Sequence, residues 1–275
     1  MSAVIDLQAD AARPPARRLP LLRWTAQLVS LLLTLVVWHL LATRHVHLGI
    51  VTFANVPAPR EVLDAALELL RSPKLVLHLR SSLYRIAGGF ALAALAGVGL
   101  GLAIGRWRGA RLLLLPPLEV LRPIPAVAWI PLSILLFPSS EASMIFITFI
   151  GALFPILLNT IHGVEGVDAR LIASARGLGT GRLRLFPAVI LPAAAPSIVT
   201  GLAIGMGTCW FCLVTAEMIS GQFGIGYFTW EAYTLQNYAD IIVGMLLIGV
   251  LGMGSSALIR ALGRWLMPWQ REKRA

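Results

Sequence analysis

Six long apolar runs, separated by short polar segments, constrain the fold of this chain more than any other feature. They cover residues 21–42, 83–105, 112–137, 142–162, 188–219 and 241–262. A helix needs about 20 apolar residues to cross the hydrocarbon core of a bilayer, and a segment in lipid must satisfy its backbone hydrogen bonds within the protein. Continuous runs favour helices over the alternating pattern of a membrane barrel. We therefore expect an all-α integral membrane protein with six transmembrane helices.

The composition excludes the main soluble alternatives. Of the 275 residues, 57% are hydrophobic and only 13% are charged, against about 25% charged residues in an ordinary soluble domain. A soluble fold of this size cannot remove so much apolar surface from water, which excludes a soluble enzyme and a disordered chain. The net charge of +10 comes from residues scattered over short loops. It is more typical of a cytoplasmic membrane face than of nucleic-acid binding.

The runs divide the chain into four parts. Residues 1–20 are predicted to be a disordered cytoplasmic tail, and residues 21–82 to hold the first span and an amphipathic surface helix near residues 61–70. Residues 83–267 form the expected core domain, with five spans and a polar cytoplasmic segment at 163–186. Residues 268–275 form a second cytoplasmic tail.

Two of the runs have unusual residues. The second run contains Gly97-x-x-x-Gly101-x-x-x-Gly105, a spacing that lets another helix approach closely. The third run carries five prolines, which predict a kinked or broken helix: Pro116, Pro117, Pro123, Pro125 and Pro131.

The orientation follows from the positive charges. Six spans place both chain ends on one side, and most of the 23 lysines and arginines then fall on that side, in the tails, after the second run and in 163–186. Because cytoplasmic loops retain lysine and arginine, we expect both termini and the 163–186 segment to be cytoplasmic. Arg85 and Arg122 fall within spans.

No pattern in the sequence indicates catalysis or metal binding. Cys209 and Cys212 form a C-x-x-C pair inside an apolar run, where cysteine behaves as a small hydrophobic residue. His45 and His47 have no nearby carboxylate or cysteine to complete a metal site. A phosphate-binding loop is also lacking. If the protein moves a solute uphill with ATP, another chain must therefore bind the nucleotide. We expect this chain not to be an enzyme.

The cytoplasmic segment is the most informative part of the sequence. Residues 167–182 predict a short helix with Asp168 as its N-cap and Gly179 as a left-handed stop. Leu171, Ala175 and Leu178 share one face of that helix. Such a helix, projecting between two spans, can dock in a groove of a partner, although an ordinary solvated loop helix has the same pattern.

This segment resembles the "EAA" loop of ABC importer permeases, which reads Glu-Ala-Ala, three residues, Gly, nine residues, Ile, one residue, Leu-Pro. Here the corresponding residues are Ala173-Ser174-Ala175, Gly179, Val189 and Leu191-Pro192, so that alanine replaces the glutamate of the motif. Other stretches are similar to the nitrate, sulfonate, taurine and bicarbonate branch of that family. They cover 121–132, 154–160, 198–202, 216–219 and 224–227.

The resemblance implies a homodimeric permease with the type I ABC importer permease (MetI-like) fold, in the inner (cytoplasmic) membrane of a bacterium. Two ABC ATPase subunits would bind ATP and Mg²⁺, and this chain would bind no cofactor. An extracytoplasmic substrate-binding protein would deliver a small, anionic solute. The residues that the resemblance assigns to ATPase coupling are Arg170, Leu171, Ala173, Ser174, Ala175, Arg176, Leu178 and Gly179.

Charged side chains inside a membrane are expensive and usually functional, which suggests residues of the translocation path. Glu119 and Arg122 have i, i+3 spacing and either pair with each other or line the path. Glu217 either stabilises a helix end or acts at a gate, and the Thr208 hydroxyl either lines the path or bonds back to its own helix. The alternatives to a permease are a non-transporting membrane scaffold and an intramembrane enzyme.

Overall fold

The computed structural model describes residues 20–47 and 49–270. Within these ranges the regular structure is helical, apart from one isolated bridge between His47 and Thr52. The tail expected over residues 1–20 lies outside them except for its last residue, and the tail expected over 268–275 lies outside them after residue 270. The described chain forms two compact units that meet between Leu63 and Asp64.

The first unit contains the first apolar run. Its residues form α1 (Pro20–Thr43), and the Trp38 indole donates a hydrogen bond to the Pro57 carbonyl. The predicted amphipathic helix is confirmed as α2 (Pro59–Arg71), which crosses the boundary between the units. On α2, Val62 is buried while Leu67 is exposed. Its position at a membrane surface stays a prediction.

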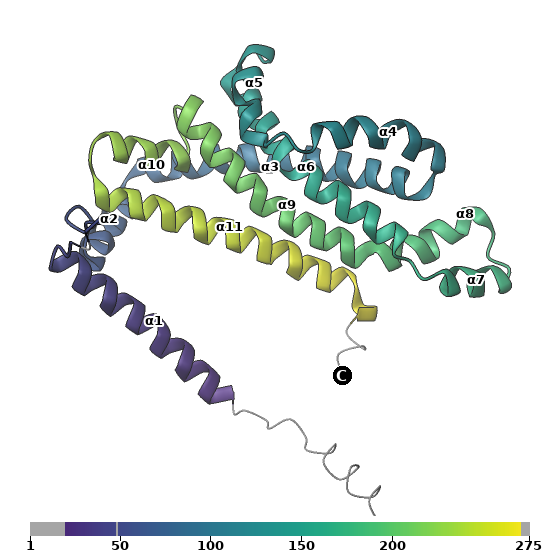
Figure 1. Cartoon of the computed structure of the whole chain (residues 1–275), viewed down its shortest axis with the longest axis horizontal. Helices are drawn as coiled ribbons and strands as arrows, with labels where there is room; N and C mark the ends of the chain where they lie inside the picture. Colours follow the sequence, from purple (N-terminus) through teal and green to yellow (C-terminus); the bar gives the residue numbers. More distant parts are fainter. Residues whose placement is uncertain (1–19, 48, 271–275) are drawn as a thin grey trace, which may run out of the picture. The chain divides into compact units, whose positions relative to one another are not determined.

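The second unit is a bundle of long helices (Figure 1). The long helices are α3 (Pro73–Arg106), α6 (Ser140–Glu165), α9 (Leu191–Ser220) and α11 (Tyr238–Leu266). The shorter ones are α4 (Arg108–Leu121), α5 (Ile130–Leu136), α7 (Ala169–Gly177), α8 (Arg182–Leu185) and α10 (Ile225–Thr234). Short 3₁₀ segments cover Ala126–Trp129 and Pro268–Gln270, and a π-helical turn covers Phe186–Ile190.

The described chain has five helices long and apolar enough to cross a membrane, and a bent pair that makes a sixth span if it is counted as one. The pair consists of α4 and the segment Ala126–Leu136, which meet at an angle of 86°. The break coincides with prolines of the third run. α4 ends at Leu121, just before Pro123 and Pro125. The predicted break is confirmed.

Glycines bring α3 and α6 together and fix their relative direction. A Cβ atom on Gly89 would meet Thr148, one on Gly97 would meet Ile156, and one on Gly105 would meet Val164. Residue numbers rise together along both helices, so α3 and α6 run parallel. The close approach predicted from the Gly97–Gly105 repeat is confirmed, and its physical cause is the absence of side chains on the α3 face.

The parallel packing decides how the bent pair is connected. α3 ends at the end of the bundle opposite to the start of α6, so residues 107–139 must return over the length of the bundle. The packed stretch from Arg85 to Gly105 is about 30 Å long at 1.5 Å per residue, which equals the hydrocarbon thickness of a bilayer. The bent pair is therefore a broken span, and the described chain has six spans.

α9 runs antiparallel to α6. A Cβ on Gly201 would meet Asn159, whereas one on Gly205 would meet Ile156. We call the end of the bundle where α9 begins the α7 end, and the end where α9 finishes the α10 end; Figure 1 shows α7 and α8 at one end and α10 at the other. Cys209 and Cys212 are free, buried thiols on α9, which confirms their interpretation as small hydrophobic residues.

Two features of the bundle differ from the sequence prediction. α3 begins at Pro73 rather than at residue 83, so the expected domain boundary falls inside this helix. Ser72 caps it by accepting a hydrogen bond from the Lys74 amide, with Pro73 in the first turn, where a missing N–H costs nothing. Residues 225–234 form α10, where the sequence indicated only a loop.

Candidate functional site

The segment 163–186 folds as predicted. Asp168 caps α7 by accepting a hydrogen bond from the Arg170 amide (2.8 Å). Gly179 has φ = 82°, and the Thr180 amide donates to the Ala175 carbonyl (3.0 Å) across the turn. This is a left-handed helix stop, a conformation that glycine adopts without the steric penalty of a Cβ atom.

Three leucines are exposed on this segment among charged and polar residues. Leu178 is 88% exposed, and Leu171 and Leu183 are exposed as well. Ile172 and Ala175 pack instead against a buried cluster that includes Ile190 and Ala194. Ala175 therefore faces the bundle rather than sharing the exposed face of Leu171 and Leu178, because α7 lies against the π-helical turn Phe186–Ile190 that leads into α9. Arg170, Ala173, Ser174 and Arg176 are exposed.

A second site lies at the α10 end, where three charged residues from three helices meet. Arg85 of α3 is only 1% exposed. Its Nε and Nη2 atoms donate to Glu141 at the start of α6, and its Nη1 atom donates to Glu217 near the end of α9 (2.8 Å). Glu217 is fully buried, whereas the Glu141 side chain is 52% exposed. We call these three residues the Arg85 cluster.

The buried charges of the Arg85 cluster are paired with each other and hydrogen-bonded to neighbouring groups. Both carboxylates accept from the same guanidinium, and Glu217 also accepts from the Ser82 hydroxyl (2.8 Å) and from the Gly226 amide (2.9 Å). A buried charge is stable only when it is paired and hydrogen-bonded in this way. Sequence reasoning placed Arg85 in a span but missed the cluster, although His78, Ser82 and Arg85 recur at i, i+4 and i+7 on one helix face.

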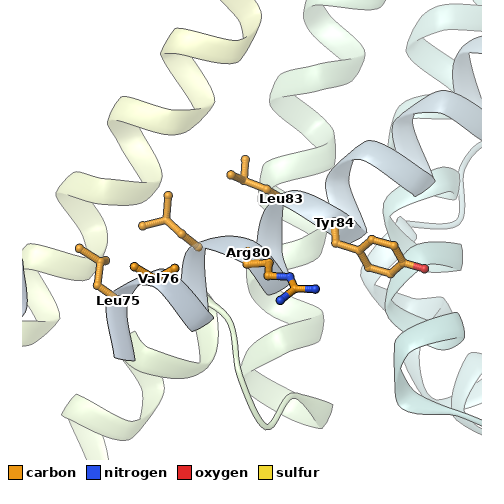
Figure 2. A pocket seen from close by; sticks show the side chains of 6 residues that line it. Leu75, Val76, Arg80, Leu83 and Tyr84 are labelled. Carbon is orange, nitrogen blue, oxygen red and sulfur yellow. The ribbon is translucent and has the colours of Figure 1, made fainter. Parts of the chain in front are cut away.

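The opposite face of α3 is apolar. An open hollow of about 640 Å³ along this face is lined by side chains of α3 alone; Figure 2 shows these side chains along the helix. They are Leu75, Val76, Leu79, Arg80, Leu83 and Tyr84. Near the start of α3, the polar residues His78, Ser82 and Arg85 thus point into the bundle, while Val76, Leu83 and Tyr84 are exposed, as suits a helix surface in lipid. Arg80, near the helix start, can extend its charge toward the membrane interface.

The predicted path residues occupy separate places. Glu119 and Arg122 are exposed and form no ion pair in the described chain. Pairing, one of the two alternatives, is therefore not present, although the Arg122 backbone is still helical and its amide donates to the Leu118 carbonyl (3.0 Å). The place of both residues in the path stays a prediction. The Thr208 hydroxyl bonds back to the Gly205 carbonyl (2.9 Å) on its own helix. Glu217, expected at a helix end or gate, belongs to the Arg85 cluster.

Comparisons with known proteins agree with this architecture. Residues 73–272 match the family of the binding-protein-dependent transport system inner membrane component. The chain is therefore a multi-pass membrane protein of the transport class. It belongs to this family of ABC transporter permeases, and its role is that of a transport permease rather than a scaffold or an intramembrane enzyme.

Three similar proteins come from different organisms. A putative ABC transporter permease of Methanocaldococcus jannaschii is 39% identical over 230 residues, covering 80% of this chain and 83% of that protein. The nitrate import permease NrtB of Synechocystis sp. is 33% identical, covering 89% and 90%. The putative aliphatic sulfonates transport permease SsuC of Bacillus subtilis is 36% identical, covering 81% of both chains.

Proposed function

We propose that this permease imports a small anionic solute, of the nitrate, sulfonate, taurine or bicarbonate type, in an ATP-driven complex. Two of the similar proteins are named for nitrate and for aliphatic sulfonates, both of which are anions. The permease has no nucleotide-binding motif, and a separate pair of ABC ATPase subunits binds ATP and Mg²⁺. An extracytoplasmic substrate-binding protein, the partner implied by the family description, delivers the solute.

The observation that supports ATP coupling is the shape of α7 and its turn. Leu178 extends into open space beside a glycine with positive φ, while Ile172 packs the same helix against the buried cluster at the turn that leads into α9. An exposed leucine on a short, anchored helix fits the groove of a partner protein. We assign this contact to the ATPase, and we assign Arg170, Leu171, Ala173, Ser174, Ala175, Arg176, Leu178 and Gly179 to it.

We further propose that two copies of the permease enclose the path. α9 packs on α3, α6 and α11 and nevertheless leaves one stripe of its surface uncovered: Thr200, Ile204, Gly207 and Phe211 are exposed. A Cβ on Gly207 would meet no atom within 4 Å. In the proposed dimer, this stripe faces the second copy across the path, and Thr208 lies at its edge.

The proposed orientation places the α7 end and both termini in the cytoplasm. Arg106 ends α3, Arg108 and Arg111 lie at the start of α4, and Arg260 and Arg264 lie near the end of α11. Lysines and arginines are retained on the cytoplasmic side of a membrane. The α10 end is then extracytoplasmic.

Thiol labelling of intact cells tests this orientation. Ser140→Cys and Gln222→Cys are expected to react with an impermeant reagent added outside, and Thr180→Cys is expected to react only after the membrane is opened. The native Cys209 and Cys212 are buried and should not react, so the protein without an introduced cysteine is the control for background labelling. Labelling of Thr180→Cys from outside would show the reverse orientation.

Arg122 is the strongest candidate for contact with the anion. It is an exposed cation without an ion-pair partner in the described chain, at the break of the third span. A fixed cation at membrane depth lowers the barrier for an anion. We also assign Glu119 to the path, on the same exposed helix end. Glu217 is fully buried and bound to Ser82, Arg85 and Gly226, so we assign it to the α10 end of the path as a residue that acts through its neighbours and does not touch the solute.

The proposed function is tested by purification and uptake. The tagged permease, extracted from its own cells in mild detergent, is expected to retain a P-loop ATPase, and the complex in liposomes is expected to accumulate labelled nitrate, taurine, an alkanesulfonate or bicarbonate with the binding protein and ATP. Arg122→Gln should lower uptake about tenfold, the effect of one coupling of ordinary size, while the ATPase stays bound. A permease that purifies without an ATPase, or a complex that accumulates no anion, would contradict the proposal.

A further inference from the structure

The turn that leads into α10 is held by side chains of other helices. Three successive amides donate to them: Gly224 to His78 Nδ1 (3.1 Å), Ile225 to Ser82 (2.9 Å) and Gly226 to Glu217 (2.9 Å). The Phe223 carbonyl accepts from Arg85 Nη1 (2.6 Å). These amides belong to the first turn of α10, where no helical carbonyl is available, and the N-cap residue Gly224 has no side chain to satisfy them.

Glu217 is the member of this network that belongs to α9. Its carboxylate accepts from Ser82 and Arg85 of α3 through one oxygen and from Gly226 of α10 through the other. A negative charge at the first turn of α10 is also favoured by the helix dipole. Glu217 thus joins three helices at one buried point.

Glycines shape the turn around Glu217. A Cβ on Gly224 would meet the Glu217 carboxylate, and one on Gly226 would lie 3.0 Å from Glu217 Cβ. Gly224 also has φ = 136°, which side chains rarely adopt. The fit leaves no room for the turn to slide past Glu217, so the end of α9 and the start of α10 must move together.

The other end of α9 adjoins the α7 segment. α9 has 30 residues, about 45 Å of continuous helix at 1.5 Å per residue. At its start, Ala194 and Ile198 belong to the buried cluster on which Ile172 and Ala175 of the α7 segment pack. A displacement of the α7 segment therefore reaches the start of α9 through the π-helical turn Phe186–Ile190, and the other end of α9 holds α10 through Glu217.

We propose that Glu217 is a positioning residue that couples the two ends of the permease, because it makes α10 follow the movement of α9. This inference rests on the proposed function, in which a bound ATPase displaces the α7 segment. α10 carries an exposed aromatic pair, Trp230 and Tyr233, whose rings lie 5.4 Å apart. When α10 moves, the surroundings of this pair change.

The test uses Glu217→Gln in the assembled complex in liposomes. Glutamine keeps the size of the side chain but offers one acceptor oxygen, so it cannot accept from both α3 and α10. The expected result is that the variant still binds the ATPase and hydrolyses ATP, while the solute transported per ATP hydrolysed falls about tenfold. Glu68→Gln, an exposed carboxylate on α2, is the matched control and should leave this ratio unchanged.

A second readout follows α10 directly. A thiol at Tyr233→Cys, which is exposed in this structure, is expected to change its reaction rate with an impermeant reagent when ATP is added, and to lose that response when Glu217→Gln is present. Glu217→Gln complexes with the wild-type transport ratio, or with an unchanged ATP response of this thiol, would overturn the inference. Failure of the proposed function is distinct, because then the wild-type permease itself would retain no ATPase.

Discussion

Gly179→Asp is expected to reduce uptake to background while the permease stays folded, dimeric and in the membrane. Gly179 has φ = 82°, and a Cβ atom added to it would meet no other atom within 4 Å, so the variant meets no clash in the permease itself. Aspartate tolerates this backbone better than most side chains, at roughly 1 kcal/mol of strain. The larger effect is a carboxylate beside Leu178, in the surface assigned to the ATPase, where an unpaired charge weakens binding by about 2–5 kcal/mol.

Two matched variants separate the charge from the backbone. Gly179→Asn has nearly the same shape without the charge and should keep part of the uptake. Gly181→Asp places the same charge two residues away, at the N-cap of α8, where φ is −67° and aspartate is favourable. It should behave like the wild type. ATPase bound per permease and uptake in vesicles are the measurements; normal values for Gly179→Asp would show that this turn is not the coupling contact.

Arg85→Met is expected to destabilise the permease by about 3–5 kcal/mol, the cost of leaving a buried charge without its partner. Methionine is close to arginine in length and fills much of the same space. Glu217 has 0% exposure and would keep only Ser82 and Gly226 as partners. Glu141 is half exposed, so water compensates most of its loss. Thermal unfolding and the monodisperse yield in detergent measure the effect.

The double variant Arg85→Met with Glu217→Gln tests the cause of this loss. Because the uncompensated charge is gone, it should be more stable than Arg85→Met alone. Glu165→Gln removes the exposed ion pair of Arg111 and Glu165 and should cost no more than about 1 kcal/mol. A double variant no more stable than the single one would show that shape, rather than charge, is what Arg85 contributes.

The sequence contained enough information for the apolar spans, for the two ends of α7 and for the family. The length of an apolar run indicates whether a segment partitions from water into lipid. The bounds of α1, α6 and α11 were therefore predicted closely. The N-cap at Asp168 and the left-handed stop at Gly179 were predicted because each depends on a few neighbouring residues. The break in the third span was predicted for the same reason, since Pro123 and Pro125 limit their own backbone and that of the residue before them.

The Arg85 cluster could not be predicted because its members lie far apart in the sequence. Arg85 and Glu217 are separated by 132 residues, and their pairing depends on α3, α6 and α9 packing together. Polar residues of α3 also misplaced its start: Lys74, His78 and Arg80 lower the hydropathy of its first turns, so the span appeared to begin at residue 83. α10 was missed because its first turn is capped by other helices instead of by its own residues. Local sequence thus determined which segments are helical and apolar, whereas only tertiary structure decided which buried polar groups meet, since each needs a partner from another helix.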